Sequence, residues 1–392
     1  MKHWKSVIMI VGCVIILALV VALNWNVDTS YNNGRSSSAR IKYEKARVIR
    51  ISDETLQKDT RAGSNLYIGG QNLEVEILSG EHRGDIVGVY SALSLYYNVH
   101  AKEGMTIIVA INNNNDYSED HIHDESCNHN DDDYDVDVFS YNRAPYLYGL
   151  IILFFISLIL IGGKKGFRSA LGLLLTVLSI LFLFLPMLFR GVPPVLAAII
   201  TGIVSTFAVL GLLNHFSRKT FSAILGTVLG VTVAGTVAAV SGYFAKIGIF
   251  NTPEAEGLVF LAQDVPLKLN GIFFAGTIIS ALGAVMDIGI SIAASVFEIA
   301  GMNKKLTVQK LFASGMNIGK DMMGTMSNTL VLAFAGASVN VLILLYAYSL
   351  PFNQLLNLDM LGIELLQALS GTMGVIAAVP ITAFISAYLA KK

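Results

Sequence analysis

The sequence has little charge of either sign and very little cysteine, and each shortage excludes a class of protein. Charged residues make up 14% of the 392 positions, against roughly 25% in soluble domains, so much of the surface must be solvated by lipid. A net charge of −1 without a basic face argues against a nucleic-acid partner. Only two cysteines are present, Cys13 in an apolar run and Cys127 in a polar loop, so no disulfide framework is expected.

The chain also lacks the common motifs of enzymes. It contains no GxxxxGKS/T phosphate loop, no GxSxG nucleophile elbow and no HExxH zinc motif. Residues 317–321 (NIGKD) are similar to the GxGD motif of intramembrane aspartyl proteases, but lysine stands where that motif has glycine, and no tyrosine precedes Asp287. We therefore expect that the protein is not an enzyme, and keep intramembrane proteolysis only as an alternative.

What the sequence has instead is a series of long apolar runs. Residues 6–23 are just long enough to span a bilayer, and we interpret them as an uncleaved anchor, with a cleaved signal peptide as the alternative. Seven further spans are predicted after residue 145, at 146–161, 170–189, 195–213, 220–240, 271–290, 325–345 and 363–388. The expected fold is an α-helical polytopic membrane protein with about eight transmembrane helices. It divides into an anchor at 1–23, an exported domain at 24–145 and a seven-helix domain at 146–392.

Basic residues near the ends of these runs predict the orientation. One side of the predicted membrane domain collects Lys2, Lys5, Lys164, Lys165, Arg168, Arg218, Lys219, Lys304, Lys305, Lys310, Lys320, Lys391 and Lys392. The other side has only Arg143, Arg190, Lys246 and Lys268. The positive-inside rule then places both termini in the cytoplasm and residues 24–145 outside it.

The polar residues 24–145 predict a small exported β-rich domain between the first and second helices. Runs typical of strands occur at 46–51, 73–78, 85–90 and 105–111, with a hairpin-like turn cluster at 79–84. We expect a small β-barrel or β-sandwich of about five strands.

A segment rich in asparagine, aspartate and histidine, 112–137, interrupts this domain. It carries His121, His123, Cys127 and His129. Imidazole, thiolate and carboxylate groups bind zinc and similar ions, so one hypothesis is a weak divalent-cation site in this exported loop. The alternative is a disordered, solvated acidic loop whose histidines are incidental, because no fixed metal-site spacing is present. No other cofactor is expected.

Polar side chains recur on one face of two predicted helices. Asp287, Ser291, Ser295 and Glu298 return to one face, and on the next helix Ser314, Asn317, Asp321, Thr325 and Asn328 do the same. A carboxylate at the bilayer centre costs at least ~2.5–3.5 kcal/mol, so these groups should face protein or water.

These residues are the candidate functional site. We hypothesise that Asp287 and Asp321 hold a cation or relay a proton in a hydrated cavity, with neutral ligands from Ser291, Asn317, Thr325 and Asn328. For Glu298 and Asp321 the alternative is a position at the headgroups, paired with neighbouring lysines. A second spacing, with Ser222, Gly226, Gly230, Ala234, Ala238 and Gly242 at every fourth position, predicts close packing of a neighbouring helix.

Five segments resemble the YibE/YibF-like family of bacterial multi-pass membrane proteins. They are 71–84 (QNLEVEILSGEHRG), 162–166 (GGKKG), 282–291 (LGAVMDIGIS), 317–325 (NIGKDMMGT) and 380–382 (PIT). The resemblance implies a bacterial cell membrane protein with an exported region and a polytopic domain, and it supplies no substrate or catalytic residue.

Two functions follow as expectations. The first is a transporter or permease-like protein for an inorganic ion or small solute, coupled to a cation or proton. The second is a non-transporting envelope assembly or sensing protein whose exported domain binds a partner or a divalent metal. The expected partner is the lipid bilayer, and the small-residue spacing also permits a homo-oligomer or a paralogous membrane partner.

Overall fold

The computed structural model describes residues 41–59, 66–94, 97–113, 134–214, 217–252, 254–348 and 350–391. They fall into two compact units that divide after Ile156, and each is described by itself. We call the strands of the first the β unit and the helices after residue 156 the helical unit. The predicted anchor at 1–23 lies outside the described residues, as do His121, His123, Cys127 and His129.

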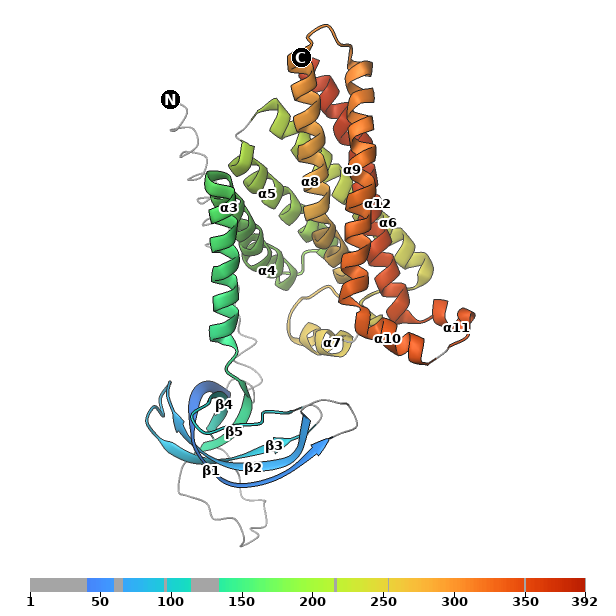
Figure 1. The fold of residues 1–392 in the computed structure, drawn as a ribbon. Helices are drawn as coiled ribbons and strands as arrows, with labels where there is room; N and C mark the ends of the chain where they lie inside the picture. Colours follow the sequence, from blue (N-terminus) through green and yellow to red (C-terminus); the bar gives the residue numbers. More distant parts are fainter. Residues whose placement is uncertain are drawn as a thin grey trace. The chain divides into compact units, whose positions relative to one another are not determined.

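The β unit is one antiparallel sheet of five strands in the order β3-β2-β1-β4-β5 (Figure 1). The strands are β1 (Ile41–Asp59), β2 (Leu66–Ile77), β3 (Ile86–Leu93), β4 (Thr106–Asn113) and β5 (Tyr134–Tyr141). β1 pairs with β4 along its first half and with β2 along its second, and two register shifts follow Val48 and Ile51. Such irregularities bend a strand, so the sheet curls into a half-barrel and its edge strands β3 and β5 approach each other. The described residues form this single sheet and not the alternative sandwich.

Alternate residues of each strand fill the concave side of the sheet. β3 alternates strictly between exposed and buried positions, and the core includes Val48, Leu73, Ile107 and Val109. Gln71 is the fully buried polar side chain among them. Its amide donates to the Ala101 carbonyl (3.2 Å) and accepts from the Ala101 N–H (2.9 Å), which ties the loop after β3 to the sheet.

The strand β5 corrects the predicted extent of the insertion. Residues 112 and 113 end β4, and residues 134–137 begin β5, so the sequence between the two strands is shorter than 112–137. The strand was not predicted because its aspartates are typical of a loop. In the structure Asp135 and Asp137 are exposed, whereas Val136 and Val138 pack against the core. The predicted turn at 79–84 is confirmed between β2 and β3.

The helical unit contains long helices joined by short connections (Figure 1). Its elements are α3 (Ala144–Ser179, which begins before the division), η1 (Ile180–Phe184), α4 (Leu185–Phe189), α5 (Pro194–Asn214), α6 (Arg218–Ala245), η2 (Ile249–Asn251), α7 (Ala255–Asp264), α8 (Ile272–Met302), α9 (Val308–Ala337), α10 (Val339–Ala347), α11 (Phe352–Leu356) and α12 (Asp359–Lys391). Lys391 donates a hydrogen bond to the Lys304 carbonyl (2.8 Å), so the end of α12 and the α8–α9 loop lie at the same end of this unit.

Within the described residues, five helices are long and apolar enough to cross a membrane, or six if the bent pair α9 and α10 counts as one. The predicted count of about eight also includes the anchor at 1–23, which lies outside the described residues. The predicted spans 146–161 and 170–189 fall in one stretch, Ala144–Phe189, which is interrupted at Gly163 (φ 53°, ψ −132°). A Cβ added at Gly166 would collide with the Leu158 carbonyl, so the chain bends sharply there. The GGKKG segment is therefore a turn.

The predicted span at 325–345 is wrong in position. α9 begins at Val308 and the chain bends by 65° between α9 and α10, so residues 339–345 do not continue the helix. Ser338 leaves helical geometry (φ −100°, ψ 14°), two residues after Gly336. Glycine and serine in close succession are a common cause of such bends.

The predicted small-residue spacing is a packing surface. The six small residues at this four-residue spacing are all buried. α12 packs against Gly226 and Gly230, and Phe274 of α8 packs against Gly242. Gly226 lies against Thr382, and Gly230 lies against Ala378 and the Gly374 carbonyl. This confirms that the spacing allows a neighbouring helix to approach closely.

Candidate functional site

The candidate site residues lie on two antiparallel neighbours, α8 and α9. Gly319 of α9 packs against Ile292 of α8, and Gly315 packs against Val296 one turn further. This register places Asp287 level with residue 324 of α9. Asp287 therefore differs in height by about 4.5 Å from Asp321 and by about 6 Å from Asn328, because each residue rises 1.5 Å along a helix. The two carboxylates lie at nearly the same depth.

On α8, Asp287 is exposed on the side of the helix that faces away from the helical core. Val285 and Gly289 are buried, and a residue two positions from each lies about 200° around the helix. Ser291 is partly buried on this side, and its carbonyl accepts a hydrogen bond from the Ser295 hydroxyl (3.0 Å). Glu298 is exposed near the end of the helix.

On α9, Asn317, Asp321, Thr325 and Asn328 are all exposed. The opposite side of this helix carries Leu311, Gly315 and Gly319, which are buried. The Thr325 hydroxyl donates to the Met322 carbonyl of its own helix (3.0 Å). Within the part of the chain that the structure describes, the side chains of Asn317, Asp321 and Asn328 have no hydrogen-bond partner.

The structure thus brings the two carboxylates to one level but does not turn them toward each other. Asp287 and Asp321 each point away from the contact between α8 and α9. The predicted cavity between these two helices is occupied by close packing of glycines against Ile292 and Val296. Among the described residues, the polar side chains of α8 and α9 form two outward faces rather than one enclosed site.

An outward polar face on a membrane-length helix is energetically unfavourable in contact with lipid. A carboxylate exposed to the bilayer centre costs about 2.5–3.5 kcal/mol, and amides without partners add to this cost. Most other exposed side chains of the long helices are large and apolar, for example Leu173, Leu229 and Phe384. Among the described helices, the polar face of α9 is the exception to this apolar surface. Its side chains need water or a protein surface to supply their hydrogen-bond partners.

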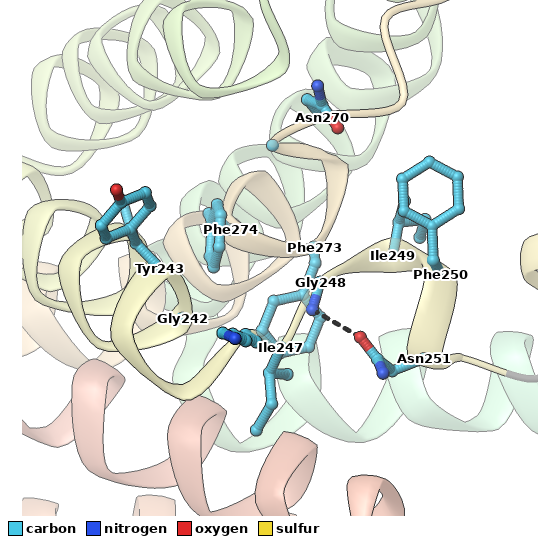
Figure 2. A pocket seen from close by; sticks show the side chains of 13 residues that line it. Gly242, Tyr243, Ile247, Gly248, Ile249, Phe250, Asn251, Asn270, Phe273 and Phe274 are labelled. Atoms are coloured by element: carbon cyan, nitrogen blue, oxygen red, sulfur yellow. Dashed lines mark hydrogen bonds between the residues drawn. The ribbon is translucent and has the colours of Figure 1, made fainter.

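The sequence reasoning missed a pocket of about 610 Å³ between the end of α6, η2 and the beginning of α8. Figure 2 shows the aromatic rings of Tyr243, Phe273 and Phe274 around it, and the Asn251 side chain bonded to the Gly248 N–H (3.0 Å). Lys246 supplies the one charge in its lining and has a left-handed backbone (φ 55°). This mostly apolar lining suits a ligand with little hydration, and the hypothesised site residues are elsewhere.

In the β unit, a small polar cluster holds the beginning of β5 beside the β2–β3 turn. The His82 and Tyr134 rings stack with centroids 3.9 Å apart, and the Tyr134 hydroxyl donates to Asp85 (3.0 Å). The Lys42 ammonium donates to Glu81 (2.6 Å), and this bond holds the pKa of Glu81 below its ordinary value. Among the described residues, no group of three or more metal-ligating side chains is present.

Comparison with known proteins supports the resemblance seen in the sequence. No curated protein and no solved structure matches the chain. A family model described as YibE/F-like protein matches residues 150–392, which is well over half of the chain and takes in α8, α9 and α12. The β strands precede the matched region. The chain therefore belongs to the YibE/F-like protein family.

Proposed function

We propose that the protein is a multi-pass membrane permease for an inorganic ion or small solute, and that the polar faces of α8 and α9 line its path. The observation that carries this proposal is the outward face of α9, with Asn317, Asp321, Thr325 and Asn328 exposed along about three turns of a membrane-length helix. Lipid cannot solvate such a face, whereas a hydrated path can.

Asp287 and Asp321 are the charged groups of this path. By the register of the two helices the carboxylates differ by about 4.5 Å in height, so a cation or proton that passes this depth of the membrane can meet each carboxylate on its own helix face. The oxygen atoms of Asn317, Thr325 and Asn328 extend along the face on either side of Asp321 and can replace part of a hydration shell. Intramembrane acids in such positions commonly mark ion or proton pathways.

The proposed setting is the bacterial cytoplasmic membrane, with both termini in the cytoplasm and the β unit outside. The hydrogen bond between Lys391 and the Lys304 carbonyl supports one part of this orientation. It keeps the basic α8–α9 loop and the basic C-terminus at one end of the helical unit, as the positive-inside rule requires.

The test is flux through the purified full chain in liposomes. Proton entry is followed with a trapped pH-sensitive dye under a potassium diffusion potential, with sodium, potassium and magnesium gradients as further probes. We expect Asp287→Asn and Asp321→Asn each to lower the flux by roughly tenfold or more, because a charged intramembrane ligand is lost. Glu298→Gln, which changes an exposed acid near the helix end, is the matched control. Full flux in both aspartate variants would overturn the proposal.

A second candidate function rests on the outer face of the β unit. The Tyr43 and Phe139 rings pack at an interplanar angle of 56° with centroids 4.6 Å apart and are 55% and 49% exposed, and Tyr90 is also exposed. Exposed aromatic patches of this kind are typical of protein-binding surfaces and support an assembly or sensing role. If Tyr43→Ser with Phe139→Ser abolishes the cellular phenotype while liposome flux persists, this candidate is favoured over transport.

A further inference from the structure

The pocket in Figure 2 lies well away from the polar faces of α8 and α9. Its volume of about 610 Å³ is within the roughly 300–1,000 Å³ that is typical of ligand sites. The lining reaches along α8 only as far as Phe274, and Asp287 comes 13 residues later. This separation is about 20 Å along the helix, so a ligand in the pocket would not touch the candidate site residues.

A strained turn at the end of α6 places a lysine in this lining. Lys246 follows the last residue of α6 and has a left-handed backbone (φ 55°), the only one among the described residues other than glycine. The Ile247 N–H donates to the Gly242 carbonyl (2.9 Å) and holds the turn. Glycine is the usual residue at this position of a helix end, because it adopts a positive φ without strain. A lysine that keeps this conformation indicates a role for its side chain.

The positive charge of Lys246 is not neutralised in the pocket. Among the described residues, its ammonium has no ion-pair partner and the lining contains no acidic side chain. Most of the lining is apolar, with the Phe273 and Phe274 rings of α8 on one side. A ligand that suits both parts of the lining carries a negative group for Lys246 and apolar surface for the rings.

The pocket lies at one end of two helices of membrane length. α6 ends at the pocket and α8 begins there, so it is at the opposite end of α8 from the loop that contains Lys304. Tyr243 and Phe250 in its lining are 79% and 61% exposed. Tyrosine is enriched where a bilayer meets water, because its ring is apolar and its hydroxyl is polar. A molecule held in the bilayer can therefore reach this pocket directly.

We propose that the pocket binds one anionic phospholipid of the surrounding membrane, with the lipid phosphate at the Lys246 ammonium and part of an acyl chain against Phe273 and Phe274. The proposal rests on α6 and α8 crossing a bilayer, and it does not depend on the proposed transport function. The first apolar run of the chain, residues 6–23, does not meet the same requirement, because it contains no acidic side chain that could neutralise Lys246.

Native mass spectrometry of the full chain in dodecyl maltoside tests the role of the charge, with dioleoyl phosphatidylglycerol and dioleoyl phosphatidylcholine as probes. We expect one phosphatidylglycerol to bind each chain at least roughly fivefold more tightly than phosphatidylcholine does. Lys246→Gly should abolish this preference, and glycine adopts the left-handed backbone without strain, so the variant should fold. Lys246→Arg should keep the preference.

The matched control is Lys268→Gln, which removes an exposed lysine that lies outside the lining and should leave the preference unchanged. Three outcomes would overturn the proposal: a parent chain that binds no phosphatidylglycerol, equal binding of the two lipids, or an unchanged preference in Lys246→Gly.

A second pair of variants tests the space that the acyl chain would fill. Ala239→Leu adds a larger side chain to the lining and should weaken phosphatidylglycerol binding severalfold. Ala245→Leu, at an exposed position of the same helix outside the lining, should not. Equal binding by both variants would mean that the lipid lies elsewhere, which overturns the proposal.

A soluble probe distinguishes the membrane from water as the source of the anion. Glycerol 3-phosphate carries the phosphate without acyl chains, so it should displace phosphatidylglycerol only at concentrations at least roughly a hundredfold higher. Displacement at similar concentrations would mean that the pocket takes a small soluble anion, and the assignment to a lipid would fall.

Discussion

The β unit and the helical unit place their polar side chains by opposite rules. In the β unit, polar residues alternate outward to water, and the buried amide of Gln71 bonds to both backbone groups of Ala101. In the helical unit, the outer surface is mainly large apolar side chains, and small residues fill the contact between α6 and α12. An exposed polar face is ordinary in the first unit and exceptional in the second. The exception on α9 is therefore the informative feature of the molecule.

The strongest test of this contrast is Gly230→Leu in the contact between α6 and α12. A side chain there would meet Ala378, Val285 and the Gly374 carbonyl, so the two helices must separate. We expect the yield of monodisperse full-length protein in detergent to fall roughly tenfold. Gly276→Leu, at an open glycine, is the control. Normal yield from Gly230→Leu would mean that this contact is not the core of the unit.

A smaller effect is expected from Gln71→Leu in the β unit. The change leaves the buried N–H and carbonyl of Ala101 without partners, which costs about 1–3 kcal/mol. Amide hydrogen exchange at residues 99–101 of the full chain measures it, since the lost bonds close this loop. Gln57→Leu on the exposed side of β1 should leave that exchange unchanged.

The polar face of α9 should contribute little to the stability of one chain. Asn317→Leu with Asn328→Leu removes side chains that have no hydrogen-bond partner among the described residues. We expect the unfolding free energy of the monomer in detergent to change by less than about 0.5 kcal/mol. Destabilisation well beyond that would show that this face packs within the chain, and the comparison between the units would fail.

The smallest effect concerns the surface pair of Lys42 and Glu81. The hydrogen bond from Lys42, together with its charge, lowers the pKa of Glu81 below the ordinary value of 4.5. The stabilisation from this pair is therefore complete above pH 4.5 and is lost as the pH falls through the lowered pKa. In thermal unfolding of the full chain, Glu81→Gln should differ slightly from the parent at neutral pH. The difference should shrink on acidification and in high salt. A difference that grows as the pH falls would contradict this.

The sequence predicts the elements that depend on local pattern. Apolar length predicted the long helices, and the four-residue spacing from Ser222 to Gly242 predicted a close helix contact. The strand β5 was missed because its aspartates are typical of a loop, although its valines alternate. The bend at Ser338 was missed because Gly336 and Ser338 interrupt no apolar run.

The candidate site shows what the spacing of residues along a helix cannot predict. Spacing predicts that Asn317, Asp321 and Asn328 share one face, but it does not predict what that face meets. That depends on Gly315 and Gly319, whose missing side chains let α8 and α12 cover the opposite side of α9. The pocket in Figure 2 could not be predicted either, because residues from separate stretches, 239–251 and 270–274, assemble its lining.

Gly163 limits the length of the uninterrupted helix in the stretch Ala144–Phe189. A straight helix from Ala144 to Phe189 would be about 69 Å long, which is more than twice the ~30 Å of a hydrocarbon layer. Gly163 prevents this by adopting a conformation that residues with a Cβ rarely adopt, so the stretch becomes two arms of bilayer length. A single alanine at this position would favour one rod of more than twice the bilayer thickness over two shorter helical segments.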